Sequence, residues 1–123
     1  MEEVLKELEA YYPKVRNWYE NKVIGDTNRL VKIVTDSATG ETKGLLILKK
    51  YFNDRKISTL FVVKKYRGRG IGRDLLMLSI EEFKREAFYV DIHKDVMSEY
   101  VALMENHGLI KAPITENRYH WMG

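Results

Sequence analysis

The spacing of hydrophobic and polar residues predicts helices at the start of the chain and strands after them. Up to about residue 23 the apolar positions follow helical spacing. Pro13 interrupts this segment, and a residue before proline is pushed out of the helical region. We therefore expect two short helices with Pro13 in the first turn of the second. The apolar positions are Val4, Leu5, Leu8, Tyr11, Tyr12 and Val15.

Three strands are predicted next. Arg29–Thr35 and Gly44–Lys50 are rich in β-branched and aliphatic residues, and Asp36–Gly40 between them has the composition of a turn. This pattern predicts an antiparallel hairpin. Residues Tyr51–Arg55 then turn the chain into a third strand at Lys56–Val63, which completes a meander.

The second half of the chain alternates helices with short strands. From Ile71 to Ala87 apolar residues recur on one half of a helix, so this segment is predicted to pack on the sheet. The following strand, Phe88–Ile92, should lie parallel to Lys56–Val63 because a helix connects the two. A further helix is predicted over Val96–His107.

The chain is predicted to finish with a short hairpin. Its strands are Leu109–Pro113 and Arg118–Met122, and Ile114–Asn117 forms the turn. No repeat, linker or low-complexity segment interrupts this order, so we expect residues 1–123 to form a single domain.

The segment between the third strand and the next helix contains three closely spaced glycines. Glycine lets backbone N–H groups approach a ligand closely, and the N-terminus of the following helix adds further donors and a partial positive charge. The segment therefore predicts a binding site for phosphate or pyrophosphate. Its glycines are Gly68, Gly70 and Gly72, and its cations are Lys64, Lys65, Arg67, Arg69 and Arg73.

Two common phosphate-binding motifs do not fit this segment. A P-loop requires Gly-Lys followed by Ser or Thr, which does not occur. A dinucleotide-binding fingerprint fits at first, since Asp91 lies about 20 residues further on. It fails because Arg73 stands at the third glycine position and the chain is too short for a second mononucleotide-binding half.

A third motif fits at every fixed position. Residues 67–72 read Arg-Gly-Arg-Gly-Ile-Gly and match Arg/Gln-x-x-Gly-x-Gly/Ala, the pyrophosphate loop of the GNAT N-acetyltransferases. The order of elements from about Thr27 to Met122, including Gly108-Leu109 in place of a frequent Gly-Phe, also resembles one small GNAT domain. The resemblance implies an α/β (α+β) fold with a mixed, mostly antiparallel sheet of about six strands flanked by helices. The strand before the loop and the parallel strand after it should splay apart.

This resemblance also implies the cofactor and its binding residues. The acyl donor would be acetyl-CoA, and no metal is expected. Its pantetheine arm would enter the splayed gap and pair with the backbone of Phe61, Val62 and Val63. Its pyrophosphate would be held by Arg67, Gly68, Arg69, Gly70, Ile71, Gly72 and Arg73.

The chain departs from the family at the usual positions for proton transfer. Where members often carry a glutamate base, this chain has Ser58, and where they carry a tyrosine acid it has Met104. Tyr100, one turn earlier on the same helix, and His93, at the end of the splayed strand, are the candidate substitutes. Asp91 and His107 are weaker candidates, because lone histidines and acids are more often structural.

The resemblance predicts an N-acetyltransferase that passes the acetyl group directly to a primary amine, in a small molecule or a protein. With no cysteine, the chain has no thiolate for an acyl-enzyme. Two alternatives stay open. One is a relative that binds CoA without catalysis, as Ser58 and Met104 suggest. The other is a nucleic-acid-binding module that uses the basic glycine loop with Tyr66.

Composition narrows these possibilities. The net charge of +3 is small and concentrated near the glycine loop, which favours a local anion site over a nucleic-acid surface, so we expect no nucleic-acid partner. The apolar runs are too short for a membrane span, and the acidic N-terminus is unlike a signal peptide, so we expect a cytoplasmic protein without membrane contact.

Either a monomer or a homodimer is compatible with the sequence. The first two helices are expected to cover one sheet face, and Trp18 and Tyr19 could line an acceptor pocket there.

Overall fold

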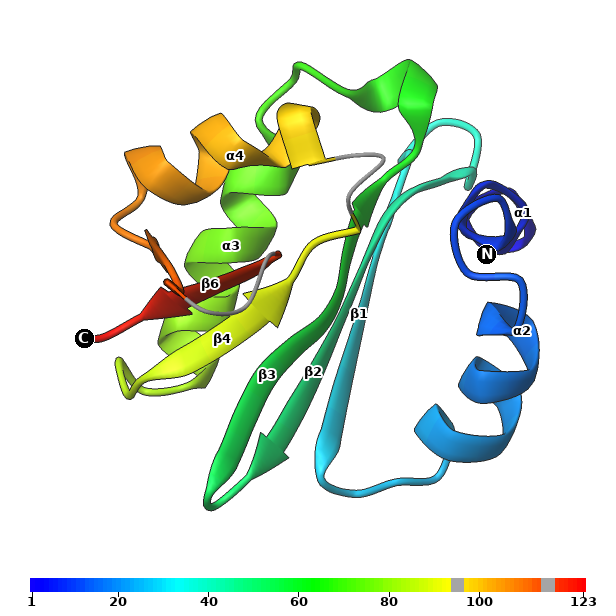
Figure 1. Ribbon diagram of the computed structural model, residues 1–123. Helices are drawn as coiled ribbons and strands as arrows, with labels where there is room; N and C mark the ends of the chain where they lie inside the picture. The colour runs from blue at the N-terminus through cyan, green and yellow to red at the C-terminus, as the bar shows by residue number, and fades with distance from the viewer. Residues whose placement is uncertain (94–96, 114–116) are drawn as a thin grey trace.

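The computed structural model describes residues 1–93, 97–113 and 117–123, and it shows one six-stranded sheet between two helical layers (Figure 1). The strand order is β1-β2-β3-β4-β6-β5. Helices α1 and α2 cover one face, and α3 and α4 cover the other. The strands are β1 Arg29–Thr35, β2 Thr42–Tyr51, β3 Asp54–Val62, β4 Phe88–Asp91, β5 Ile110–Lys111 and β6 Arg118–Trp121. The helices are α1 Glu2–Glu9, α2 Val15–Trp18 with a π-helical turn at Tyr19–Val23, a 3₁₀ turn at Lys64–Tyr66, α3 Ile71–Glu82 and α4 Met97–Asn106.

The strand pairing confirms the predicted fold class. Strands β1, β2 and β3 form an antiparallel meander, β4 joins β3 in parallel, and β6 pairs antiparallel with both β4 and β5. The sheet is therefore mixed and mostly antiparallel. The parallel pairing follows from the crossover through α3.

The contact between β3 and β4 is very short. Only Lys56 with Tyr89 and Ile57 with Val90 are in register, after which β3 continues to Val62 while β4 turns away. Figure 1 shows the two strands diverging above this point. The predicted splay is confirmed, and it leaves the β4-side edge of β3 without a neighbouring strand beyond Ile57.

A β-bulge in β3 lies at the point of divergence. Ile47 of β2 is opposite Thr59, whereas the next residue, Leu48, is opposite Ile57, so Ser58 is an extra residue in β3. A bulge bends its strand and increases its twist. It also places Ser58 and Thr59 on the same side of the sheet, where regular alternation would separate them.

The sheet separates two hydrophobic clusters, and β2 contributes to both. Leu46 and Leu48 belong to the cluster under α3 and α4, whereas Leu45 and Ile47 belong to the cluster under α1 and α2. All four side chains are buried, as expected for a central strand covered on both faces. The first two helices thus cover a sheet face, as predicted.

Several element boundaries differ from the predictions. Helix α3 ends at Glu82 instead of Ala87, because Lys84 and Arg85 have φ values of 53° and 59°, outside the helical region. The turn predicted at Tyr51–Arg55 shrinks to Phe52 and Asn53, since β2 and β3 extend into it. Helix α2 begins at Val15, two residues after Pro13. Val96 and residues 114–116, predicted as a helix start and a turn, lie outside the described residues.

In the described part of the chain, no helix has both the length and the apolar character needed to cross a membrane.

The burial of β2 generates a stability prediction. Leu46 is fully buried at 0% exposure, so Leu46→Ala should lower the free energy of unfolding by about 2–5 kcal/mol through lost burial and a cavity. Ile33→Ala on β1 is the control, because Ile33 is 44% exposed and should cost less than about 1 kcal/mol. Chemical denaturation would measure both. Equal costs would contradict the assignment of Leu46 to the core.

Candidate functional site

Three hollows follow one another from the glycine segment to the far side of the sheet. We call them the loop hollow, the strand gap and the cleft. Tyr100 lines both the loop hollow and the strand gap. Tyr11, Ser58, Thr59 and Asp91 line both the strand gap and the cleft. The shared residues show that the three hollows are neighbours, with the small strand gap, about 60 Å³, between the other two.

The loop hollow, about 480 Å³, is formed by the glycine segment. Gly68 and Gly70 have φ values of 79° and 83°, a backbone region that side chains disfavour. Gly70 is the N-cap residue of α3 and makes no side-chain cap bond. The first N–H groups of α3 therefore have no side-chain acceptor and can bind an anion in the adjoining hollow.

Gly72 differs from the other two glycines because its φ is not positive. It lies in the first turn of α3, and a Cβ added there would lie 3.4 Å from Leu103 Cδ2 of α4 and 3.8 Å from Val62 Cγ2 of β3. Both are ordinary van der Waals distances, so neither packing nor backbone conformation requires glycine at this position.

The cations of the glycine segment have unequal positions. Arg67 and Arg73 line the loop hollow. Arg67 Nε donates a hydrogen bond of 2.8 Å to the Val62 carbonyl, and its guanidinium lies 5.1 Å from the Phe61 ring. Arg69 lies outside the lining and over the Tyr66 ring, at 5.6 Å. The sequence analysis grouped all three arginines as pyrophosphate ligands, and the structure brings only two of them to the hollow.

Tyr66 is part of the fold rather than a surface platform. Its side chain is buried, and its hydroxyl donates a 2.8 Å hydrogen bond to Glu41 Oε2. Lys65 also pairs with Glu41, and this ion pair, together with the Tyr66 hydroxyl, lowers the pKa of the Glu41 carboxyl. A buried ring offers no face on which a nucleobase could stack. The nucleic-acid alternative loses the aromatic contact on which it depended.

Helix α1 is tied to the glycine segment. Glu7 Oε1 accepts a 2.9 Å hydrogen bond from the backbone N–H of Lys64, which begins the 3₁₀ turn before the glycines. These residues lie 57 positions apart in the sequence. This hydrogen bond therefore links helix α1, which lies beside the cleft, to the start of the glycine segment.

The strand gap is lined by several of the predicted catalytic candidates. Tyr100 and Met104 of α4 are buried there, and His93 is half-buried between the rings of Tyr11, at 5.5 Å, and Tyr12, at 5.3 Å. Met104 lines this gap, and its thioether has no proton to donate. Phe61 lines the gap from β3.

Besides Arg69, the predicted residues Val63 and His107 also lie outside the three hollows. Val63 is buried, and its N–H donates to the Lys43 carbonyl at 2.8 Å. The His107 ring Nδ1 lies 2.8 Å from the Leu103 carbonyl at the end of α4. His107 is therefore engaged by its own helix, as the structural reading of a lone histidine implies.

The cleft is the largest hollow, about 700 Å³, and has two unlike walls. The α1–α2 segment supplies an aromatic wall that includes Tyr12, Pro13 and Trp18. The sheet supplies a polar floor of Arg29, Lys49, Lys56, Ser58 and Thr59. Trp18 therefore lines a pocket as considered from the sequence, whereas Tyr19 is not among the lining residues.

Sequence reasoning missed the cationic floor. Arg29, Lys49 and Lys56 come from three different strands, and each was read only as part of a strand signal. The charged residues on β1, β2 and β3 were the available sign of a cationic surface. To use this sign one must know which side chains of each strand point to the same face of the sheet, and the bulge at Ser58 changes that face midway along β3.

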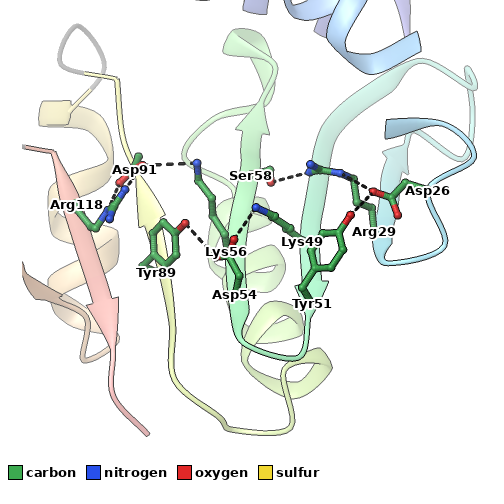
Figure 2. Close-up of polar contacts among 10 residues, drawn as sticks. All are labelled: Asp26, Arg29, Lys49, Tyr51, Asp54, Lys56, Ser58, Tyr89, Asp91 and Arg118. Carbon is green, nitrogen blue, oxygen red and sulfur yellow. Dashed lines mark hydrogen bonds and ion pairs between the residues drawn. The ribbon is translucent and has the colours of Figure 1, made fainter. Parts of the chain in front are cut away.

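Figure 2 shows that the floor is an ordered polar network. Ser58 accepts a 3.2 Å hydrogen bond from Arg29 Nη1. Arg118 binds Asp91 through two hydrogen bonds of 2.7 and 3.0 Å, and this contact lowers the pKa of the Asp91 carboxyl. Asp91 stays ionised at neutral pH. The remaining ion pairs of the network are Arg29 with Asp26, Lys49 with Asp54, and Lys56 with Asp91.

Burial raises the pKa of Tyr12 at the mouth of the strand gap, and the charge of Asp91 adds to the effect. The Tyr12 hydroxyl is therefore neutral at physiological pH. Among the residues that the structure describes, no three histidine, aspartate or glutamate side chains gather closely enough to hold a metal ion.

Comparison with known proteins gives a consistent result. The model of the acetyltransferase (GNAT) family matches residues 1–109. No curated protein matches the sequence significantly.

Solved structures show the same fold at low identity. PaiA N-acetyltransferase from Thermoplasma acidophilum, in complex with coenzyme A, gives a TM-score of 0.69 at 15% identity, over 91% of this chain and 76% of that one. Tetrahymena GCN5 gives 0.67 at 12% identity, over 96% and 82%. An acetyltransferase from Bacillus anthracis in complex with acetyl coenzyme A gives 0.60 at 19% identity, over 82% of this chain and 65% of that chain. This chain thus spans just under two thirds of the Bacillus protein.

Proposed function

Because the chain belongs to the GNAT acetyltransferase family, we propose that it transfers the acetyl group of acetyl-CoA directly to a primary amine. One observation carries this proposal: the loop hollow and the cleft lie on either side of the strand gap and share lining residues with it. The donor and the acceptor would enter from opposite ends and meet near Ser58. We also propose that residues 1–123 act as one catalytic domain.

The loop hollow fits the pyrophosphate of the donor. The N–H groups at the start of α3, the open backbone at Gly68 and Gly70, and the guanidiniums of Arg67 and Arg73 would all face negative charge. The pantetheine arm would pass along Phe61 and Val62, on the edge of β3 that β4 leaves open, whereas the N–H of Val63 is already bonded to the Lys43 carbonyl. The acetyl carbon would then lie near the bulge. Acetyl-CoA supplies the activated thioester.

The step of the reaction that most needs assistance is deprotonation of the acceptor amine. At pH 7 an ordinary primary amine of pKa ~10.4 must lose a proton at a cost of roughly 4–5 kcal/mol. Departure of a thiolate whose thiol has a pKa of ~8.5 costs only about 2 kcal/mol. The amine lone pair attacks the thioester carbonyl, the C–N bond forms, and the C–S bond breaks as the tetrahedral intermediate collapses. The amine proton is lost to solvent or a base, and the thiolate takes up a proton.

We assign the proton transfers to residues around the strand gap. Tyr100 lines both the gap and the loop hollow, a position from which its hydroxyl could protonate the leaving sulfur. His93 lines the gap at the cleft side and is the candidate base. Ser58 accepts a hydrogen bond from Arg29, so we assign it a role in orienting the acceptor instead of removing its proton.

A non-catalytic CoA-binding protein is the second candidate. Met104 and Ser58 occupy the positions where the family usually has an acid and a base, and this observation favours it. The two candidates share acetyl-CoA binding and differ in turnover. Binding of acetyl-CoA without acetylation of any amine tested would support the non-catalytic protein.

A matched pair of glycine substitutions tests the donor site. Gly68 and Gly40 both have positive φ and no atom within 4 Å of an added Cβ, but only Gly68 lines the loop hollow. Gly68→Glu should weaken acetyl-CoA binding at least about tenfold, because it puts negative charge where pyrophosphate would bind. Both substitutions should lower the free energy of unfolding by a similar amount, about 1 kcal/mol, and Gly40→Glu should leave acetyl-CoA binding intact. Calorimetry and thermal shift would measure both, and equal affinities would refute this donor site.

Tyr100→Phe tests the proposed acid. If Tyr100 protonates the thiolate, kcat should fall about tenfold or more at pH 7 while acetyl-CoA affinity stays unchanged. The deficit should shrink toward pH ~8.5, where the thiolate leaves unaided. Tyr119→Phe is the control, since Tyr119 is buried in the same core cluster but lines none of the hollows. Wild-type kcat in Tyr100→Phe at every pH would assign Tyr100 to the core alone.

A further inference from the structure

We propose that the amine acceptor is a small molecule that also carries a carboxylate, which the cationic floor of the cleft binds beneath the aromatic wall. The inference rests on the proposed function, because the cleft is the acceptor site only if the chain is an acetyltransferase. It adds the chemical class of the acceptor.

The lining of the cleft contains more cationic than acidic residues. Arg29, Lys49 and Lys56 line the cleft, with side chains 13%, 27% and 29% exposed. Their partners Asp26 and Asp54 are absent from the lining, and Asp91 is the acid that lines it. The cleft therefore has an excess of positive charge along its lining.

The carboxylates neutralise the network only in part, because Asp26, Asp54 and Asp91 face four cations, which are Arg29, Lys49, Lys56 and Arg118. Asp26 accepts hydrogen bonds from the Tyr51 hydroxyl and the Asn28 N–H, and Asp54 accepts one from the Tyr89 hydroxyl. Asp91, the acid that does line the cleft, is bound twice by Arg118. Figure 2 shows how these cations and carboxylates alternate across the strands. Lys14 adds a further positive charge to the cleft lining.

This charge distribution selects against a polycation. An acceptor with several ammonium groups would be repelled by the floor at short range, where like charges cost free energy. A carboxylate would gain charge-assisted hydrogen bonds, which are stronger than neutral ones, and a guanidinium suits its two oxygens. The already ordered floor side chains would lose little entropy on binding, since their carboxylate partners hold them in place.

The opposite wall indicates the rest of the acceptor. Trp18 and Tyr12 line the cleft from the helical side, and the Arg29 guanidinium lies 5.6 Å from the Trp18 ring. Because Arg29 already contacts Trp18, an apolar or aromatic body would lie beside this pair, against Tyr12 and Pro13, with its carboxylate on the cations. An amino acid with an aromatic side chain combines amine, carboxylate and ring within about the size that the 700 Å³ cleft admits.

The test compares acceptors that differ in charge, using release of CoA with acetyl-CoA saturating. We expect kcat/KM for phenylalanine to exceed that for phenylalaninamide and spermidine by at least about tenfold. The amide has the less basic amine, so a preference for phenylalanine would not come from amine reactivity. Phosphoethanolamine distinguishes phosphate from carboxylate, and a larger kcat/KM for it than for phenylalanine would overturn the carboxylate assignment.

Two neighbouring lysines of β2 give a matched pair of variants. Lys49 lines the cleft, whereas Lys50 pairs with Glu82 of α3 at 3.1 Å on the other sheet face. Lys49→Met should raise the KM for phenylalanine about tenfold and leave that for phenylalaninamide nearly unchanged. Lys50→Met removes the same charge and should leave the preference for phenylalanine intact. Equal effects of the two variants would show that overall charge, not the floor, sets the preference.

Direct binding measurements distinguish a failure of the proposed function from a failure of this inference alone. Calorimetry would first measure acetyl-CoA alone, then phenylalanine and spermidine on the CoA-loaded protein. Failure of acetyl-CoA to bind would overturn the proposed function and this inference with it. Acetyl-CoA binding combined with tighter binding or faster acetylation of spermidine would overturn the inference alone.

Discussion

The separation of β3 from β4 after two residue pairs is the constraint on which the rest of the structure depends. A sheet satisfies its backbone groups by continuous pairing, and a central strand that loses its neighbour leaves donors and acceptors exposed at its edge. Here the loss coincides with the extra residue at Ser58, which bends β3 where β4 departs. The open edge and the strand gap thus have one origin in the backbone.

The two helical layers use this opening differently. On one face α3 begins at the glycine segment and places its N–H groups beside the loop hollow. On the other face the α1–α2 segment stands over the sheet, and the cleft forms beneath it. The bulge brings Ser58 and Thr59 to the floor of that cleft, directly beside the gap. The arrangement places an anion-binding turn and a polar cleft on either side of the strand gap.

The sequence was sufficient for the order of elements and insufficient for the cleft. Strand β1 has the predicted bounds, and β3 and β4 splay apart as the family resemblance implied. The bulge was not predictable, because Ser58 has no special conformational signature. The end of α3 was also missed, since the residues with positive φ there are Lys84 and Arg85, not glycine. The catalytic roles of Tyr100, His93 and Ser58 stay predictions, although the structure brings all three to the strand gap.

The hydrogen bond between Glu7 and Lys64 bears on how such a site could diversify. It joins α1 to the segment that precedes the glycines, and α1 also buries Val4 and Leu8 in the core. Helix α2, which carries Trp18, is in turn joined to α1, because Arg16 donates hydrogen bonds to Glu2 and Glu9. A substitution at Arg16 would therefore disturb both helices, whereas a substitution at Trp18 changes the wall of the cleft and leaves these bonds in place. Redesign of the cleft for other ligands would start at Trp18 and keep Arg16.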